Sequence, residues 1–302
     1  MSEPMTANGI PARVGVVWRP DFDPRALAAF AAAAEQSGVD ELWLWEDCFL
    51  QGGIAQAAVA LAQTTSLVVG VGVLPAPLRT VVATALEIST LATMFPGRVQ
   101  VAIGHGVQPW MRQAGIAVTS PLTLLREYVT ALRHLLAGQT VSVAGDYIRL
   151  DAVRLEFVPE VEVPVFIGGA GPKTLKLASE VADGVLLDCQ QTAESVQTAL
   201  GYVNHGRDCT RFRQVMYLAC APGANSTERL AAESRRWKVT PASEFGVGGS
   251  ASDISAGVAP YCAAGLDTII LQPIGDEVEI PEFLEAVGRF AKASRRSGSP
   301  SR

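Results

Sequence analysis

Residues 66–74 read SLVVGVGVL, and this stretch decides the fold class. After its serine, the run contains only Val, Leu and Gly, without the polar–apolar alternation of a strand that has one face in water. Such a strand is buried on both faces, which is typical of a parallel sheet covered by helices. An apolar helical pattern follows from about Thr80 to Phe95, so the stretch opens a strand–helix unit.

The same strand-then-helix pattern recurs along the chain. Strands are predicted at 13–18, 41–45, 66–74, 98–104, 163–169, 183–188, 213–220 and 267–273. Helices are predicted from 24, at 54–63, 80–95 and 122–137, from 172, from 193, and at 226–237 and 281–293. Eight such units in 302 residues favour a closed (β/α)8 TIM barrel over an open, doubly wound sheet.

The chain is expected to form one domain over residues 13–293, after an N-terminal extension at 1–12. Two segments interrupt the alternation: 138–157 is interpreted as an inserted hairpin, and 238–253 as a Gly/Ser-rich loop. The tail at 294–302 is small, basic and rich in Ser, so it is expected to be disordered and without function.

Composition argues against several classes of protein. A net charge of -6 and a pI near 5.2 argue against a nucleic-acid partner. No apolar stretch approaches the roughly 18 residues that cross a membrane, and the N-terminus lacks the pattern of a signal peptide, so a cytoplasmic location is expected. The cysteines are scattered and unpaired in sequence, which indicates reduced thiols and no metal site: Cys48, Cys189, Cys209, Cys220 and Cys262.

The residues that follow each predicted strand are the first candidates for a functional site, because a (β/α)8 barrel builds its active site at the C-terminal ends of its strands. The strand at 41–45 runs into Glu46, Asp47 and Cys48. Two interpretations stay open. Asp47 and Cys48 are active-site groups, or Asp47 caps the next helix and Cys48 is a small buried apolar residue.

Glycines gather at three further strand ends. They occur in GVGVLPAP from Gly70, in GHGVQPW from Gly104, and in GGAGP from Gly168. Glycines at neighbouring strand ends predict a flat floor without side chains, which suits a planar ring, while the N–H groups at a helix start can hold an anion. Together they indicate a site for a large cofactor.

At this point the sequence resembles the bacterial luciferase-like oxidoreductases, whose members use FMN or the deazaflavin coenzyme F420 inside a (β/α)8 barrel. The resemblance covers about residues 13–290. It is carried by the order and spacing of GVDELWLWEDCF, VGVGVLPAPLR, LATMFPGRVQVAIGHG, LLREYVTALRHLLAG, VPVFIGGAGPKTLKLASEVADGVLL and AGLDTIIL.

The resemblance implies which residues line the cofactor ring and its ribityl-phosphate. It also implies a non-prolyl cis peptide between Gly72 and Val73. The implied cofactor-binding residues are Gly72, Val73, Gly104, His105, Gly106, Val107, Gly168, Gly169, Ala170 and Gly171.

Two positions depart from the deazaflavin-dependent pattern. Cys48 stands where those members often carry a histidine after Asp47, and Val107 stands where an acid often follows the glycines. A thiol is mostly neutral and donates weakly. His105 is therefore the best remaining proton carrier, because imidazole titrates nearest neutral pH. The predicted catalytic set is His105, Cys48 and Asp47.

Several other residues are given a structural role or an open one. His134 and His205 are interpreted as surface or packing residues, and Trp43 as core. Trp45 and Trp110 wall the substrate pocket or serve only in packing. Arg79 either meets a phosphate or is a solvated residue at a helix start.

The predicted function is hydride transfer between coenzyme F420 and a small organic substrate. The first alternative is a luciferase-like monooxygenase that uses reduced FMN and oxygen. The second is a flavin-binding protein without catalysis. Glu46 is expected to be a solvated or oligomer-facing charge, and the apolar helix VVATALEISTLATMF at 81–95 leaves surface suited to a homodimer.

Overall fold

The protein folds as a closed barrel of eight parallel strands in a computed structural model, which describes residues 11, 13–203, 212–239, 244–274 and 280–298. The barrel strands are β1 (Arg13–Trp18), β2 (Glu41–Leu44), β3 (Val68–Pro75), β4 (Val99–Gly104), β7 (Val165–Gly168), β8 (Gly184–Leu187), β9 (Arg213–Pro222) and β11 (Thr268–Pro273). They pair in the order β1-β2-β3-β4-β7-β8-β9-β11, and β11 returns to β1. The predicted (β/α)8 barrel is confirmed.

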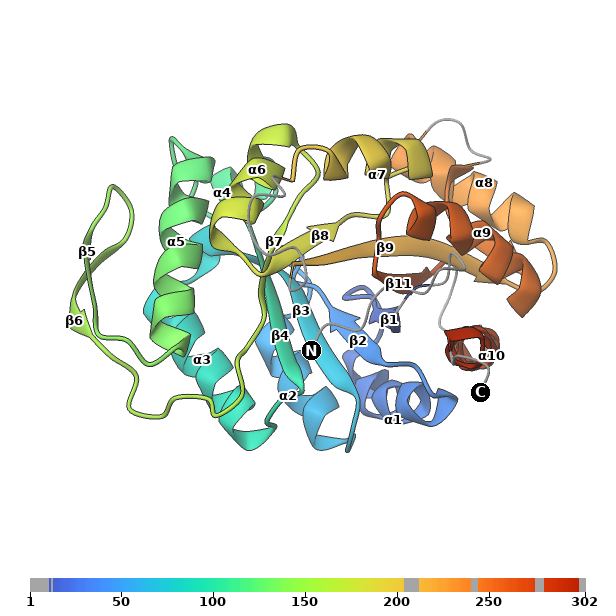
Figure 1. Cartoon of the computed structure of the whole chain (residues 1–302), viewed down its shortest axis with the longest axis horizontal. Helices are drawn as coiled ribbons and strands as arrows, with labels where there is room; N and C mark the ends of the chain where they lie inside the picture. The colour runs from blue at the N-terminus through green and yellow to red at the C-terminus, as the bar shows by residue number, and fades with distance from the viewer. Residues whose placement is uncertain (1–10, 12, 204–211, 240–243, 275–279, 299–302) are drawn as a thin grey trace.

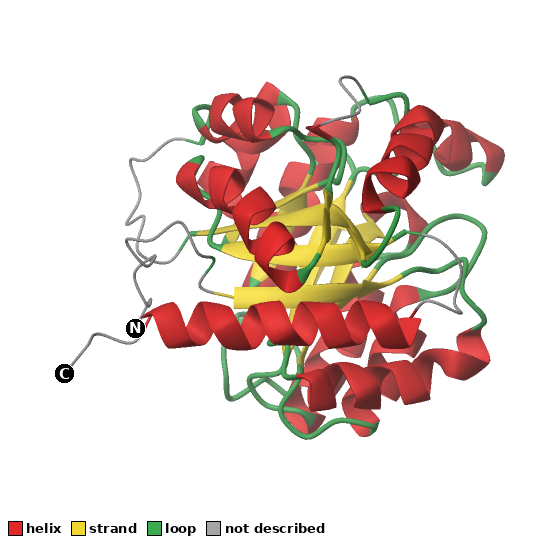
Figure 2. Cartoon of the chain, turned by 90° about the vertical axis from the view of Figure 1, so that its right-hand side faces the viewer, coloured by secondary structure: helices red, strands yellow, loops and turns green. Residues whose placement is uncertain are grey.

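Helices cover the outside of the barrel (Figures 1 and 2). They are α1 (Leu27–Ser37), α2 (Gly53–Ala62), α3 (Val81–Met94), α4 (Gln108–Gln113), α5 (Pro121–Leu136), α6 (Pro172–Val181), α7 (Ala193–Leu200), α8 (Ser226–Trp237), α9 (Ala251–Ala263) and α10 (Ile280–Gly298), with short 3-10 turns η1 (Pro24–Ala26) and η2 (Ala76–Leu78). One core lies between strands and helices, and a smaller one that includes Trp43, Phe166 and Tyr217 fills the barrel. This double burial explains the continuous apolar runs in the sequence.

The structure differs from the expectation in three segments. The predicted inserted hairpin is present and consists of the antiparallel strands β5 (Val141–Ala144) and β6 (Arg149–Val153). The loop predicted at 238–253, in contrast, contains a strand, β10 (Val247–Gly249). This strand pairs with the end of β9, a long-range contact that a glycine-rich sequence does not reveal. The short helix α4 was not predicted. Helix α10 continues to Gly298, past the predicted start of the disordered tail, and residues 299–302 lie outside the described residues, as do 1–10 and 12.

A buried polar network closes the barrel at the N-terminal ends of its strands. Glu41 Oε1 accepts a hydrogen bond from Arg213 Nη2 at 2.7 Å, and Glu41 Oε2 accepts from Trp43 Nε1 at 2.8 Å and Gln100 Nε2 at 2.7 Å. Arg213 also donates to Gln100 Oε1 and Thr268 Oγ1. Burial alone would raise the pKa of Glu41, but the arginine charges beside it and the Trp43 hydrogen bond outweigh burial and lower it. This end of the barrel is therefore sealed by paired groups.

Candidate functional site

A cavity of about 310 Å³ lies at the opposite end, where the strands finish. That volume is within the usual range of small-molecule sites. Its walls come from the ends of β2, β3, β4, β7 and β8, from β9 and β11, and from the loops that follow them. The lining residues are Trp45, Glu46, Asp47, Gly72, Val73, Pro75, Gly104, His105, Gly106, Val107, Trp110, Gly168, Gly169, Leu186, Leu187, Asp188, Cys189, Gln190, Tyr217 and Gln272.

The floor of the cavity is built around Val73. The pairing of β3 with β4 shifts register between Gly72 and Leu74, so Val73 sits in a bulge. A Cβ added to Gly168 would lie 2.1 Å from Val73 Cγ1, and one added to Gly104 would lie 3.0 Å from Val73 Cγ2. The glycines thus make room for the Val73 side chain. The expectation of a floor without side chains was therefore wrong, because the Val73 side chain supplies an apolar surface there.

Tyr217 holds the bulge from the side of β9. Its hydroxyl donates to the carbonyl oxygen of Gly72 at 2.5 Å, and the Gly72–Val73 peptide is cis, as predicted. The Cys48–Phe49 peptide is also cis. Burial, followed by the charges of Asp47 and Glu41, raises the pKa of Tyr217 well above its usual value, so the phenol keeps its proton and donates. Tyr217 was not predicted as a site residue, because its position within a long strand carries no local signal.

The buried Glu46 and the half-buried Arg79 form an ion pair beside the cavity. The Arg79 guanidinium donates to both carboxylate oxygens of Glu46, at 2.7 and 3.0 Å, and the Gly53 N–H donates to Glu46 Oε2 at 2.8 Å. Glu46 is buried, so the expectation of a solvated charge was wrong. Its carboxylate accepts a hydrogen bond from the N–H group of the first residue of α2, which is the capping role considered for Asp47. Arg79 is engaged by Glu46 and does not line the cavity.

Asp47 is the carboxyl group that faces the cavity without a partner. It is half-buried, and within the described part of the chain its carboxylate makes no hydrogen bond or ion pair. The N-cap of α2 is Gly52, so Asp47 does not cap that helix. Burial, with a smaller contribution from the charge of Asp21, raises the pKa of Asp47.

The other two predicted catalytic residues differ in position. His105 is half-buried and lines the cavity, with Nδ1 at 3.2 Å from the carbonyl oxygen of Gly106. Cys48 does not line it. Burial, together with the charges of Glu46 and Asp47, raises the pKa of Cys48, so this group stays a thiol. Of the remaining histidines, His134 is exposed and His205 lies outside the described residues.

The tryptophans fall into two groups, one in the barrel core and one at the cavity. Trp43 is fully buried in the barrel, as expected of a core residue. Trp45 and Trp110 both line the cavity, and the Trp45 ring meets that of Tyr217 edge-on at 5.6 Å between centroids. Val107, predicted to lie near the cofactor, is an exposed residue of the cavity rim.

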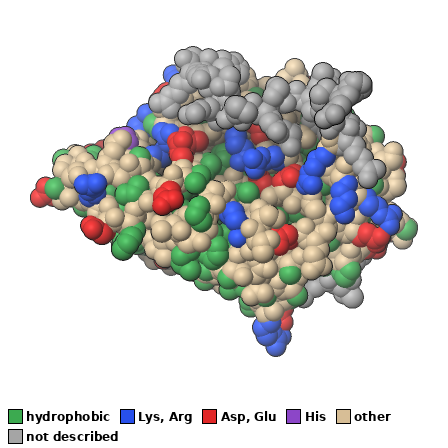
Figure 3. Space-filling view, turned by 60° about the horizontal axis from the view of Figure 1, so that its bottom comes forward, with side chains coloured by type: hydrophobic (Ala, Val, Ile, Leu, Met, Phe, Trp, Pro, Cys, Tyr) green, Lys and Arg blue, Asp and Glu red, His purple; other side chains and the backbone are tan. Residues whose placement is uncertain are grey.

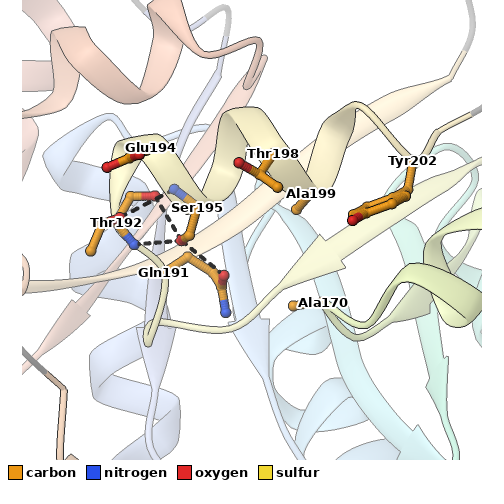
Figure 4. Close-up of a pocket in the computed structure, with 8 residues that line it drawn as sticks. All are labelled: Ala170, Gln191, Thr192, Glu194, Ser195, Thr198, Ala199 and Tyr202. Atoms are coloured by element: carbon orange, nitrogen blue, oxygen red, sulfur yellow. Dashed lines mark hydrogen bonds between the residues drawn. The ribbon is translucent and has the colours of Figure 1, made fainter.

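The loop after β7 divides between two cavities. Gly168 and Gly169 line the main one, but Ala170 lines a second cavity of about 400 Å³ along α7 (Figure 4). Gly171 is the N-cap of α6 and lines neither. The second cavity is polar, and its walls are Ala170, Gln191, Thr192, Glu194, Ser195, Thr198, Ala199 and Tyr202.

Two further properties concern the described residues as a whole. Within them, no three His, Cys, Asp or Glu side chains gather closely enough to hold a metal ion. None of their helices combines the length and apolar character needed to cross a bilayer.

The fold and the cavity define a (β/α)8 barrel with a ligand site at the C-terminal ends of its strands. The sequence model of the luciferase-like monooxygenase family matches residues 5–253, and the chain belongs to this family.

Individual relatives include enzymes named for coenzyme F420. The chain is 32% identical over 198 residues to a 5,10-methylenetetrahydromethanopterin reductase of Methanolobus tindarius, covering 64% of this chain and 60% of the relative. It is 30% identical over 184 residues to an F420-dependent glucose-6-phosphate dehydrogenase of Nakamurella multipartita, covering 55% and 52%. The chain thus matches between half and two thirds of the length of these relatives.

Solved structures share the whole fold. The coenzyme F420-dependent tetrahydromethanopterin reductase of Methanopyrus kandleri superposes with a TM-score of 0.81 at 17% identity, over 93% of this chain and 98% of that one. An F420-dependent secondary alcohol dehydrogenase in complex with an F420-acetone adduct gives 0.82 at 19% identity, over 94% and 99%. An FMN complex of the oxygenating constituent of 3,6-diketocamphane monooxygenase from Pseudomonas putida gives 0.75 at 14% identity, over 96% and 100%.

Proposed function

We propose that the protein is an oxidoreductase that transfers a hydride between coenzyme F420 and a small organic substrate. The observation that carries this proposal is the cavity itself. It is lined by the apolar bulge at Val73, which Tyr217 holds, and by the carboxyl group of Asp47, which has no partner among the described residues. The name of the relative from Nakamurella multipartita supports the choice of cofactor, and the names of both relatives, a reductase and a dehydrogenase, support the reaction class.

The residues present fit a planar, partly apolar cofactor. Val73 and Leu186 offer apolar contacts, and the strand ends that surround them carry no side chain at Gly104, Gly168 and Gly169. These residues would hold the ring, with Gly106 beside it. When bound, coenzyme F420 supplies the hydride-transfer chemistry, so the barrel contributes position and an environment of low water content.

Asp47 and His105 are the groups that would handle a proton. A hydride moved to or from a carbonyl or alcohol must be matched by a proton on oxygen, and both side chains line the cavity. The raised pKa of Asp47 lets this carboxyl hold its proton to higher pH than an exposed aspartate. Cys48 stays outside the cavity lining and keeps its thiol proton, so we assign it a supporting role below that of His105.

Two other functions remain alternatives. A monooxygenase that uses reduced FMN and oxygen has the same fold, as the FMN complex of the Pseudomonas putida enzyme illustrates. A flavin-binding protein without catalysis is favoured by Cys48 and Val107, which replace the histidine and acid that deazaflavin-dependent members often carry.

Titration of the purified protein with each cofactor tests the proposal, followed by the change in cofactor fluorescence. Micromolar binding of F420 with weaker binding of FMN is the expected result. Binding of FMN alone would move the assignment to the monooxygenase, and binding of neither cofactor would remove all three functions. Where a cofactor binds, turnover of any substrate would exclude the non-catalytic alternative.

We also propose a homodimer formed through α2 and α3, in a cytoplasmic protein. Three apolar side chains on these helices are exposed: Val59 (43%), Leu86 (54%) and Met94 (63%). Figure 3 brings the lower side of Figure 1 forward, and hydrophobic side chains are numerous on that face. Sedimentation of the protein and of the double variant Leu86→Glu/Met94→Glu is expected to give a dimer and a monomer, respectively.

A further inference from the structure

Two polar atoms next to the main cavity are buried without a hydrogen-bond partner among the described residues: Trp45 Nε1 and Gln272 Oε1. Both residues line the cavity, and Gln272 is 1% exposed. Buried polar groups are nearly always hydrogen-bonded in folded proteins, so an unpaired donor and an unpaired acceptor beside one cavity point to a ligand that pairs with both.

These two atoms belong to one half of the cavity. Trp45 follows β2 and Gln272 lies near the end of β11, in the continuous strand series β9-β11-β1-β2. The glycine-lined surface around Val73 and Leu186 is built by the other four strands, β3, β4, β7 and β8. The barrel therefore offers an apolar half with small residues and a second half with hydrogen-bonding groups.

The charged residues of the cavity have one sign. The described lining residues that carry charge are acids: Glu46, Asp47 and Asp188. Glu46 is neutralised by Arg79, whereas the carboxylate of Asp47 has no cation beside it among the described residues. A phosphate or carboxylate in this half would be desolvated against a carboxylate, which disfavours binding.

We propose that the half of the cavity bounded by Trp45 and Gln272 binds the substrate, and that this substrate is an uncharged molecule bearing a hydroxyl group. A hydroxyl group donates to an acceptor such as Gln272 Oε1 and accepts from a donor such as Trp45 Nε1–H. A carboxylate only accepts, so it leaves Gln272 Oε1 unpaired as well as facing Asp47. The inference rests on the proposed function for its division of the cavity between cofactor and substrate.

A matched set of probes on one scaffold tests the inference: cyclohexanol, cyclohexanecarboxylate and cyclohexyl phosphate. Binding is measured by saturation-transfer NMR, with the protein alone and with F420 at the concentration that saturates it. Cyclohexanol is expected to bind at least tenfold more tightly than either anion. Gln272→Leu and Trp45→Phe are each expected to weaken cyclohexanol binding at least fivefold. Gln139→Leu, which changes an exposed glutamine outside the cavity, should leave it unchanged.

Three results would overturn the inference. They are equal or tighter binding of an anion, no detectable binding of cyclohexanol, and cyclohexanol binding that neither cavity variant changes. If Gln272→Leu does not fold, Trp45→Phe decides, because it removes the N–H and keeps an aromatic ring against Tyr217. Failure of the proposed function is separate, since F420 binding is measured in the same samples. A protein that binds F420 but prefers the anions loses only the substrate assignment.

Discussion

The two ends of the barrel differ in whether their buried polar groups have hydrogen-bond or ion-pair partners. At the N-terminal end, the fully buried Glu41 is paired with Arg213 and bonded to Trp43 and Gln100. At the C-terminal end, Asp47 has no partner among the described residues, and Gln272 Oε1 is unpaired. The pKa of Glu41 is lowered and that of Asp47 is raised, so the same type of group is stabilised as a carboxylate at one end and destabilised at the other.

This difference indicates that the N-terminal end of the barrel contributes stability and that the C-terminal end binds a ligand. Paired groups at the N-terminal end link β2, β4, β9 and β11, whereas unpaired groups at the C-terminal end cost stability that a ligand can restore. Substitutions at the two ends should therefore have different consequences.

The largest effect is expected from Arg213→Met. This change leaves the buried Glu41 carboxylate without its main cation, which should cost about 3–5 kcal/mol of unfolding free energy in urea titrations. Arg289→Met breaks an exposed pair with Glu285 and should cost at most about 0.5 kcal/mol. A loss below about 1 kcal/mol for Arg213→Met would remove the claim that this network stabilises the barrel.

A smaller effect is expected from Gly168→Ala, at the other end. The new methyl group would lie 2.1 Å from Val73 Cγ1, so the bulge must move, at a cost of about 1–3 kcal/mol and with a loss of cofactor affinity. Gly171→Ala in the same loop meets no atom within 4 Å and is the matched control. Unfolding and cofactor titrations of both variants measure the contrast. Equal behaviour would mean that the position of Val73 does not matter.

The roles of His105 and Cys48 can be compared by turnover. Because His105 lines the cavity and Cys48 does not, His105→Ala is expected to reduce kcat/KM at least about tenfold, or roughly 1.4 kcal/mol of transition-state stabilisation. Cys48→Ser should change it less than threefold. The opposite order would reverse the assignment and return the thiol to the site.

The smallest effect is a gain in stability from Asp47→Asn. Because the folded-state pKa of Asp47 is raised, the folded chain holds more protons than the unfolded one between the two pKa values, and stability falls as pH rises through the folded pKa. At neutral pH the variant should be about 0.5 kcal/mol more stable and less active. The gain should vanish at acidic pH, where the wild-type carboxyl is protonated. A loss of stability at neutral pH would show that the carboxylate has a favourable partner.

The sequence predicted most of the fold because the signal for it is local and repeated. Apolar runs such as 66–74, each followed by an amphipathic helix, reveal strands that are buried on both faces. It also predicted four of the strand ends that line the cavity, those of β2, β3, β4 and β7, since parallel strands bring their C-terminal ends to one rim. The strand β10 was missed, because it exists through pairing with β9 rather than through its own composition.

Only the tertiary structure decided which neighbouring residues face the cavity. Glu46 and Asp47 are adjacent acids with the same local signal. Their environments differ because Arg79, 33 residues from Glu46 in the sequence, pairs with Glu46 and not with Asp47. Tyr217 and Gln272 lie within apolar strands, so their place at the cavity follows from barrel closure. Sequence patterns report periodicity and burial. The partner of a charge or a hydroxyl depends on contacts between distant segments, which form only when the barrel closes.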